Sequence, residues 1–108
     1  MGRRPKYISR ERYALVRKEC EAYLMRQKVI DAGKGDPSLV ECFRELNGKL
    51  ESICLNALGA EREATIFRED IAYGRGWCKS DLCEILCYEY YVRHKRRVVG
   101  AIAAYLGI

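Results

Sequence analysis

One short segment, Gly33-Lys-Gly-Asp-Pro37, constrains the fold of this chain more than any other. Glycine accepts the positive φ that ends a helix. Asp followed by Pro favours a helix start, because Asp caps free backbone N–H groups and proline lacks one of them. Apolar residues recur at three- and four-residue spacing on both sides: Tyr13, Val16, Cys20, Tyr23, Leu24 and Ile30 before it, and Leu39, Phe43, Leu46, Leu50, Ile53 and Ala57 after it. We therefore predict two long helices joined by this turn.

These two helices have clear ends. Ser9 is a suitable N-cap for the first helix, which we expect to reach about Ala32, and Gly59 ends the second. The short connection favours an antiparallel hairpin over residues 9–58. The apolar positions of the second helix are close to a heptad repeat, and such a seam also suits contact with a second subunit. We therefore expect a homodimer.

Residues 60–108 carry the signals of three shorter helices. The first ends at Gly74, the second covers about 80–86, and the third follows a turn at 87–89 and ends near Gly107. The residues expected to face inward on the last helix are Val92, Val99, Ile102, Ala103 and Leu106. Strand alternation and hairpin turn signals are lacking. We predict one all-α domain of about five helices over residues 1–108: a basic arm (1–8), a helical hairpin (9–58) and a tri-helical unit (60–108).

Composition excludes several classes of protein. A chain of 108 residues, 49% of them hydrophobic, suffices for one small domain with a core. It has no apolar run of the roughly 20 residues that span a bilayer, so no membrane partner is expected. Met1-Gly-Arg-Arg-Pro-Lys6 lacks the apolar stretch of a secretory signal. We expect a cytoplasmic protein whose six cysteines are free thiols.

Positive charge gathers near both ends of the chain. The net charge is +5, and the basic residues cluster at Arg3, Arg4, Lys6, Arg10 and Arg12 and again over 93–97. Two basic ends on a nearly balanced middle suggest an anionic partner. The alternative is a pair of solvated faces.

The segment Glu89-Tyr-Tyr-Val-Arg-His-Lys-Arg-Arg-Val98 predicts a helix that is basic on one side. A short helix, a turn and a basic helix form the outline of a helix-turn-helix whose last helix enters the DNA major groove. Arginine pairs with guanine there, and basic side chains also neutralise phosphates. The alternative is a helix whose long aliphatic stems only cover the core.

We predict that this helix provides the DNA-binding residues. They are Tyr90, Tyr91, Arg93, His94, Lys95, Arg96 and Arg97, with Tyr90, Arg93 and Arg97 on one face and His94 beside them. Arg3 and Arg4 of the N-terminal arm are further candidates, since short basic arms can follow the minor groove. The alternative for the arm is a solubilising terminus.

The last third of the chain resembles a known family of phage regulators. The sequence Arg68-Glu-Asp-Ile-Ala-Tyr-Gly-Arg-Gly-Trp-Cys-Lys-Ser-Asp-Leu-Cys-Glu-Ile-Leu-Cys87, the basic helix and Ala101-Ile-Ala-Ala-Tyr-Leu-Gly107 resemble late-gene activators of the RinA and ArpU type. Their helix-turn-helix is similar to region 4 of bacterial sigma factors. The resemblance implies a phage or prophage protein that binds promoter DNA and contacts RNA polymerase. The chain departs from the family at its turn, where Glu89 would repel a nearby phosphate.

Catalytic and metal sites are not indicated. Cys78, Cys83, Cys87 and His94 contain no CxxC pair and match no common zinc spacing. A Cys–His nucleophile would lack a third, orienting group, and Gly33-Lys-Gly35 is a helix-ending turn rather than a phosphate loop. We expect no enzyme activity, no metal and no cofactor.

The sequence therefore favours a transcriptional regulator that binds duplex DNA sequence-specifically. One alternative is a small phage-type protein that inhibits or adapts a host nucleic-acid machine, for example an anti-CRISPR protein. A surface patch joining Tyr88, Tyr90, Tyr91 and Tyr105 would favour that alternative. A second alternative is a small DNA-packaging subunit.

Overall fold

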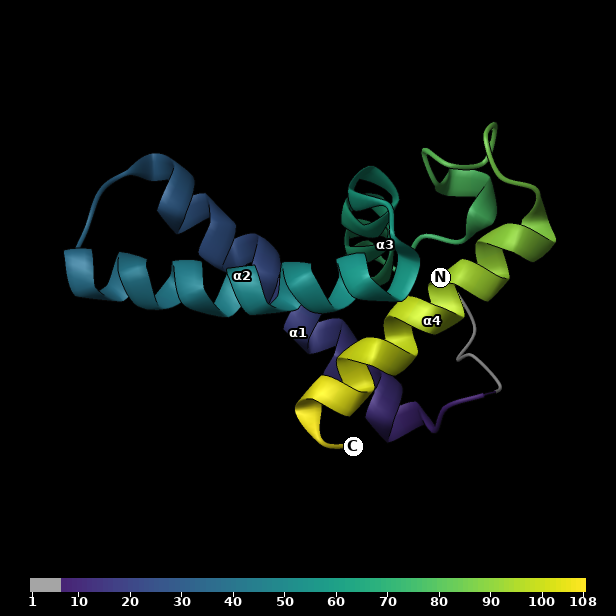
Figure 1. Ribbon diagram of the computed structural model, residues 1–108, viewed down its shortest axis with the longest axis horizontal. Coiled ribbons are helices and arrows are strands. Elements are labelled where there is room, and N and C mark those ends of the chain that lie inside the picture. The colour runs from purple at the N-terminus through teal and green to yellow at the C-terminus, as the bar shows by residue number, and fades with distance from the viewer. Residues whose placement is uncertain (1–6) are drawn as a thin grey trace.

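The computed structural model describes residues 7–108, which form four α-helices (Figure 1). They are α1 (Arg10–Ala32), α2 (Pro37–Leu58), α3 (Glu61–Tyr73) and α4 (Tyr88–Leu106), with a 3-10 turn, η1 (Trp77–Lys79), between α3 and α4. The described residues contain no β-strand, so the predicted all-α class is confirmed. Over the same residues, no helix is long and apolar enough to cross a membrane.

The hairpin begins and ends where its capping residues stand. The backbone N–H of Arg12 donates to Ser9 Oγ (3.2 Å), and that of Ser38 donates to Asp36 Oδ1 (3.0 Å). Gly33 ends α1 with a φ of 63°, in the left-handed region that favours glycine. The predicted bounds of both long helices are confirmed. They were predictable because a few neighbouring residues determine each helix end.

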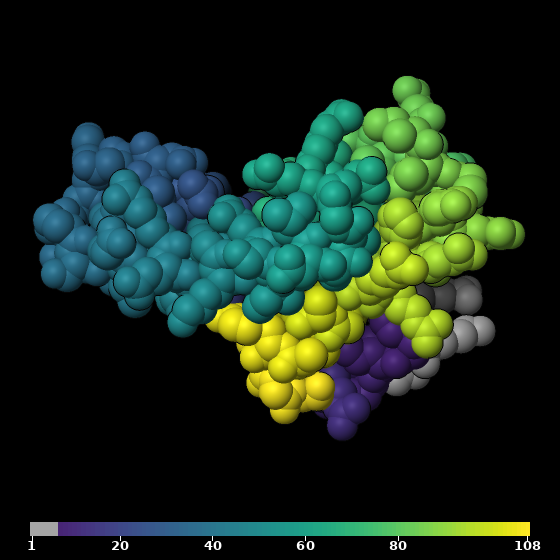
Figure 2. Space-filling model, in the orientation of Figure 1, coloured from purple at the N-terminus to yellow at the C-terminus, as the bar shows by residue number. Residues whose placement is uncertain are grey.

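The core lies at one end of the hairpin. There α3 and α4 pack against α1 and α2, whereas the end that carries the turn at 33–36 extends away from them as a narrow arm (Figures 1 and 2). Leu39, on the arm, is exposed, so the apolar seam predicted for α2 is covered only near the core. The largest fully buried side chains of the core are Val16, Leu50, Phe67, Ile71, Leu82, Tyr91, Val98, Val99 and Ile102.

A buried asparagine fixes the register of α1 against α2. Arg26 Nε donates to Asn47 Oδ1 (2.7 Å), and Asn47 Nδ2 donates to the Tyr23 carbonyl (3.2 Å) and to Gln27 Oε1 (3.2 Å). Arg26 also pairs with Glu19 at 2.8 Å. A slip along the helix would leave these buried polar groups unpaired, which costs about 1–3 kcal/mol for each group.

A buried arginine joins α3 to the hairpin. The Arg68 guanidinium lies over the Tyr23 ring, 4.6 Å from its centroid, and donates to the Thr65 hydroxyl (3.2 Å). Tyr23 in turn donates from its hydroxyl to the Glu51 carboxylate. Burial, with a further contribution from that bond, raises the pKa of Tyr23 to about 12. The buried charge of Arg68 is thus connected to the Glu51 carboxylate through one phenol.

The helix predicted over 80–86 does not form. In its place the chain makes η1 followed by consecutive turns, in which Ser80 Oγ accepts from the backbone N–H of Leu82 (3.1 Å). Trp77 Nε1 closes this loop by donating to the Leu86 carbonyl (2.8 Å). The segment therefore lacks the regular short helix of the predicted helix-turn-helix, and α4 packs chiefly on α2 and α1, with smaller contacts to α3 and η1.

Candidate nucleic-acid interface

Tyr91 anchors the N-terminal half of α4 in the core. Its ring packs on Phe67 with centroids 5.1 Å apart, and its hydroxyl donates to Asp70 Oδ2 (2.9 Å). Asp70 is fully buried, and its other oxygen lies 3.8 Å from Arg75 Nη1. Burial and the neighbouring Asp70 raise the pKa of Tyr91. The prediction that Tyr91 faces DNA is wrong, because the side chain is only 2% exposed.

Two further residues predicted to contact DNA are turned toward the protein. Lys95 Nζ donates to the Arg75 carbonyl (2.8 Å) and lies over the Tyr91 ring at 5.5 Å. Burial lowers the pKa of Lys95. His94 Nδ1 lies 3.6 Å from Glu63 Oε1 on α3. Both side chains are half-buried, and the Lys95 Nζ and His94 Nδ1 atoms face protein groups rather than a partner.

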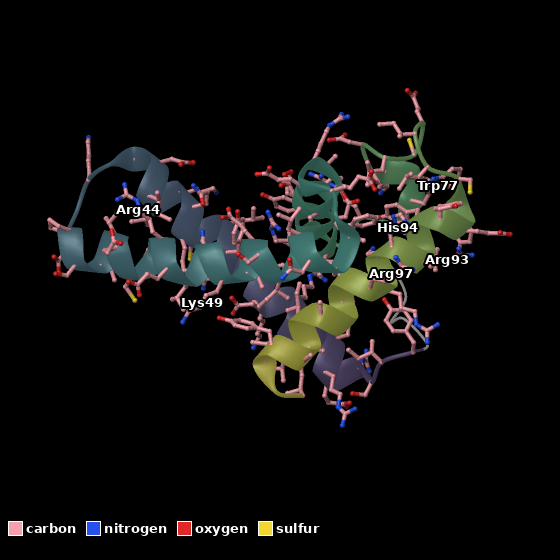
Figure 3. All side chains as sticks on the ribbon, viewed as in Figure 1. Arg44, Lys49, Trp77, Arg93, His94 and Arg97 are labelled. Carbon is pink, nitrogen blue, oxygen red and sulfur yellow. The ribbon has the colours of Figure 1, made fainter. Side chains whose placement is uncertain are left out.

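Three arginines form the exposed side of the same half-helix. Arg93, Arg96 and Arg97 are all exposed, and helical spacing places them on one face. Figure 3 labels Arg93 and Arg97 on α4. Among residues 7–108, no carboxylate oxygen lies within 4.0 Å of their guanidinium nitrogens. Tyr90 is also exposed, and its ring lies 5.4 Å from the Arg93 guanidinium carbon. We call Arg93, Arg96 and Arg97 the arginine face.

The start of α1 extends the arginine face. The Arg96 guanidinium stacks on the Tyr7 ring at 4.8 Å, and Arg10 and Arg12 are exposed in the first turn of α1. Sequence reasoning missed Tyr7, whose only signal was an aromatic ring within a basic segment. Arg3 and Arg4, the predicted arm residues, lie outside the described residues.

A shallow hollow adjoins the same surface. It has a volume of about 470 Å³ and lies between the start of α1 and the C-terminal half of α4, with Ser9, Arg12, Val99 and Gly100 in its lining. A Cβ built on Gly100 would meet no atom within 4 Å. No side chain projects from α4 at Gly100, so a partner bound to the arginine face has room to contact the helix backbone beyond Arg97.

Val92 lies at the edge of the exposed side of α4. It was predicted to face inward with Val99 and Ile102, but it is partly exposed whereas those two residues are fully buried. The buried side of α4 is instead formed by Tyr91, Val98, Val99, Ile102 and Ala103. The apolar stripe is thus rotated by about one position, or 100° around the helix, at its N-terminal end.

The loop before α4 carries a separate apolar tip. Ile85 and Tyr88 are exposed, Tyr88 by 60%, and the Trp77 ring meets Tyr88 edge-on at 6.0 Å. Three exposed acidic residues, Asp81, Glu84 and Glu89, lie close to Ile85 and Tyr88 in the sequence, and the same loop carries exposed Lys79. The four tyrosines 88, 90, 91 and 105 do not gather, because Tyr91 is buried and Tyr105 lies near the opposite end of α4. We call Trp77, Ile85 and Tyr88 the apolar tip.

The six cysteines are free thiols, and Cys83 is partly buried. Cys42, Cys78 and Cys87 are exposed, whereas Cys20 and Cys54 are buried in the core. Burial raises the pKa of Cys20 to about 12 and also raises that of Cys54. Within the part of the chain that the structure describes, no three His, Cys, Asp or Glu side chains are grouped to hold a metal ion.

The chain matches no protein-family profile, no curated protein and no solved structure. The resemblance to phage regulators of the RinA and ArpU type therefore stays a prediction from the sequence. The candidate site is defined by the geometry of α4 and the segments around it.

Proposed function

We propose that the protein binds duplex DNA through the arginine face of α4. The observation that supports this most directly is that Arg93, Arg96 and Arg97 are exposed together without a carboxylate partner among the described residues. Three cations held close together repel one another, and this arrangement is stabilised by an anionic partner. A rigid helix fixed by Tyr91 and Val98 presents them, so little ordering is needed on binding.

The dimensions of α4 suit the major groove. An α-helix with its side chains is about 10–12 Å wide, and the major groove of B-DNA is about 12 Å wide. In this pose Arg93 and Arg97 reach base edges, where arginine pairs with guanine. Arg96, Arg10 and Arg12 contact phosphates on the side of α1. Arg3 and Arg4 belong to the same proposal as further phosphate or minor-groove contacts.

The biological role within this proposal is transcription control in a phage or prophage, with RNA polymerase as a second partner. It is supported by the resemblance of residues 68–107 to late-gene activators. The contact geometry differs from the expected helix-turn-helix, because turns replace the helix over 80–86. The loop around η1, rather than a second helix, would then lie next to the DNA backbone.

A second candidate function is binding to another protein, and the apolar tip favours it. Ile85 and Tyr88 are exposed beside Asp81, Glu84 and Glu89, a combination that repels phosphate and suits a basic, apolar protein segment. An inhibitor or adaptor of a nucleic-acid machine would use such a surface. Because the four tyrosines do not form one patch, the apolar surface available for binding another protein is smaller than the sequence suggested.

The two candidates are separated by fluorescence anisotropy of a labelled random-sequence duplex, titrated with the protein at 50 mM and at 200 mM salt. Phosphate contacts predict binding at 50 mM salt that weakens steeply at 200 mM, because each contact releases condensed counterions. Absence of binding at 50 mM salt would exclude the DNA proposal and leave the apolar tip as the candidate interaction site.

A further inference from the structure

The outer side of α1 carries an apolar stripe that the fold leaves only partly covered. Leu15, Ala22, Met25 and Val29 follow a heptad-like spacing of seven, three and four residues. Met25 is 68% exposed and Leu15 46% exposed, whereas Ala22 and Val29 are partly covered. We call these four residues the α1 stripe.

The α1 stripe is distinct from the side of α1 that builds the core. The buried residues of α1 are Val16, Cys20 and Tyr23. At 100° per residue, their mean direction differs from that of the α1 stripe by about 140°. No α2 residue covers the stripe well enough to bury Met25, although α2 runs the whole length of the hairpin (Figure 1). Burying the exposed Met25 and Leu15 side chains against a partner would be favourable, because it removes apolar surface from water.

Two opposite charges flank one edge of the α1 stripe. Glu21 and Lys28 are both exposed and stand seven residues apart, on the same side of the stripe. If two identical helices pack antiparallel with Ala22 of each against Met25 of the other, the Glu21 of one copy lies opposite the Lys28 of the other. The twofold symmetry forms this pair twice. A parallel arrangement would instead bring like residues together along the stripe.

We propose that a second copy of this chain packs antiparallel on the α1 stripe, in the register that opposes Ala22 and Met25. Glu21 and Lys28 then select the orientation, and the apolar residues provide the main stabilisation. Lys18 stands within the α1 stripe, at the seam position between Leu15 and Ala22, and in this register it lies opposite Val29 of the other copy. Its aliphatic stem can cover the seam while its ammonium group reaches water. This inference does not depend on DNA binding.

The contact has a limited size. α1 is about 35 Å long, and the antiparallel overlap uses most of it on a single stripe. Such an interface is at the small end of specific protein contacts, so we expect a dissociation constant in the range of about 1–100 μM.

Sedimentation equilibrium without DNA, at 10–300 μM protein and low salt, tests the proposal. We expect the intact chain to sediment as a monomer–dimer equilibrium and Met25→Glu to sediment as a monomer. The matched control is Leu39→Glu, which places the same charge on an exposed apolar residue of α2 and should leave the equilibrium unchanged. Circular dichroism at 222 nm checks that each variant keeps its helices.

Charge reversal tests the register. Glu21→Lys alone should weaken the dimer about fivefold to tenfold, because it replaces two attractive pairs by two repulsive ones. The double variant Glu21→Lys and Lys28→Glu should restore it, since the pairs are then exchanged. A monomer at 300 μM, a dimer unaffected by Met25→Glu, or a double variant as weak as the single one would each overturn the proposal.

Discussion

Replacing Arg93, Arg96 and Arg97 by Ala would remove the arginine face and should change the salt dependence of DNA binding by a calculable amount. The three side chains are exposed and do not support the core. Alanine also preserves helix propensity. The fold of the triple variant should therefore stay intact. On a random-sequence duplex Arg93 and Arg97 have no fixed bases to pair with and are expected to neutralise phosphates as Arg96 does, so the effect on binding should reflect three lost phosphate contacts.

The magnitude follows from counterion release. On duplex DNA each neutralised phosphate contributes about 0.9 to the slope of log K against log salt, so three lost contacts reduce the slope by about 2.7. Between 50 and 200 mM salt, a fourfold change, the intact protein should then lose about 40-fold more affinity than the triple variant. Specific base contacts do not enter this difference when the duplex has a random sequence.

The assay is the anisotropy titration at four or more salt concentrations, with a control that makes the same change in net charge elsewhere. The control variant replaces Lys34, Arg44 and Lys49 by Ala; these residues are exposed on the hairpin, and Figure 3 shows Arg44 and Lys49 on α2, away from Arg93 and Arg97. A triple variant of α4 with the slope of the intact protein would refute the proposed site. Equal losses of slope in both variants would show that net charge alone attracts DNA.

Three further predictions concern residues inside the fold. Tyr91→Phe removes the bond to buried Asp70 and should lower the free energy of unfolding in urea by about 1–3 kcal/mol without changing the salt slope; unchanged stability would contradict the anchoring role. Ellman's reagent at pH 8 should modify Cys20 and Cys54 only after unfolding, because burial raises their thiol pKa values, and should react quickly in the native protein with Cys42, Cys78 and Cys87. The pKa of Tyr23 rises from 10.0 to about 12 on folding, so its contribution to stability is complete below pH 10 and is lost as the pH rises to 12. The urea midpoint should therefore fall over that range, and fall less in Tyr23→Phe; equal falls in both proteins would refute this assignment.

The hairpin was predictable because its signals are local. Ser9, Asp36 and Gly59 stand at helix ends whose hydrogen bonds involve residues within four positions, and the apolar spacing of α1 and α2 is long enough to define a helical period. The exposure of Arg93, Arg96 and Arg97 also followed from the period of α4. Leu39 is exposed because α3 and α4 do not reach the part of the hairpin where it lies (Figure 1). The local sequence pattern carries no information about how far those two helices reach.

The segment before α4 was not predictable in the same way. A helix over 80–86 is so short that its few internal hydrogen bonds would hardly offset the free-energy cost of nucleating it. The hydrogen bonds from Leu82 to Ser80 and from Trp77 to Leu86 stabilise turns instead. Tyr91 was misplaced because its basic neighbours suggested a charged face. A signal was present nonetheless, since 91, 98 and 102 lie on one helical stripe and Val92 lies one position off it.

The free energy of local opening should differ between the two ends of the hairpin, because only one end is enclosed by the core. Amide protons of α1 near Val16 and Cys20 are enclosed by the core, so they should exchange with deuterium only when the whole domain unfolds. Amides near Val29, where α1 meets only α2, can exchange when the last turns of the arm separate, at a smaller free-energy cost. We therefore expect the arm to open more readily than the body that holds α4, and a contact along α1 to slow exchange in the arm first.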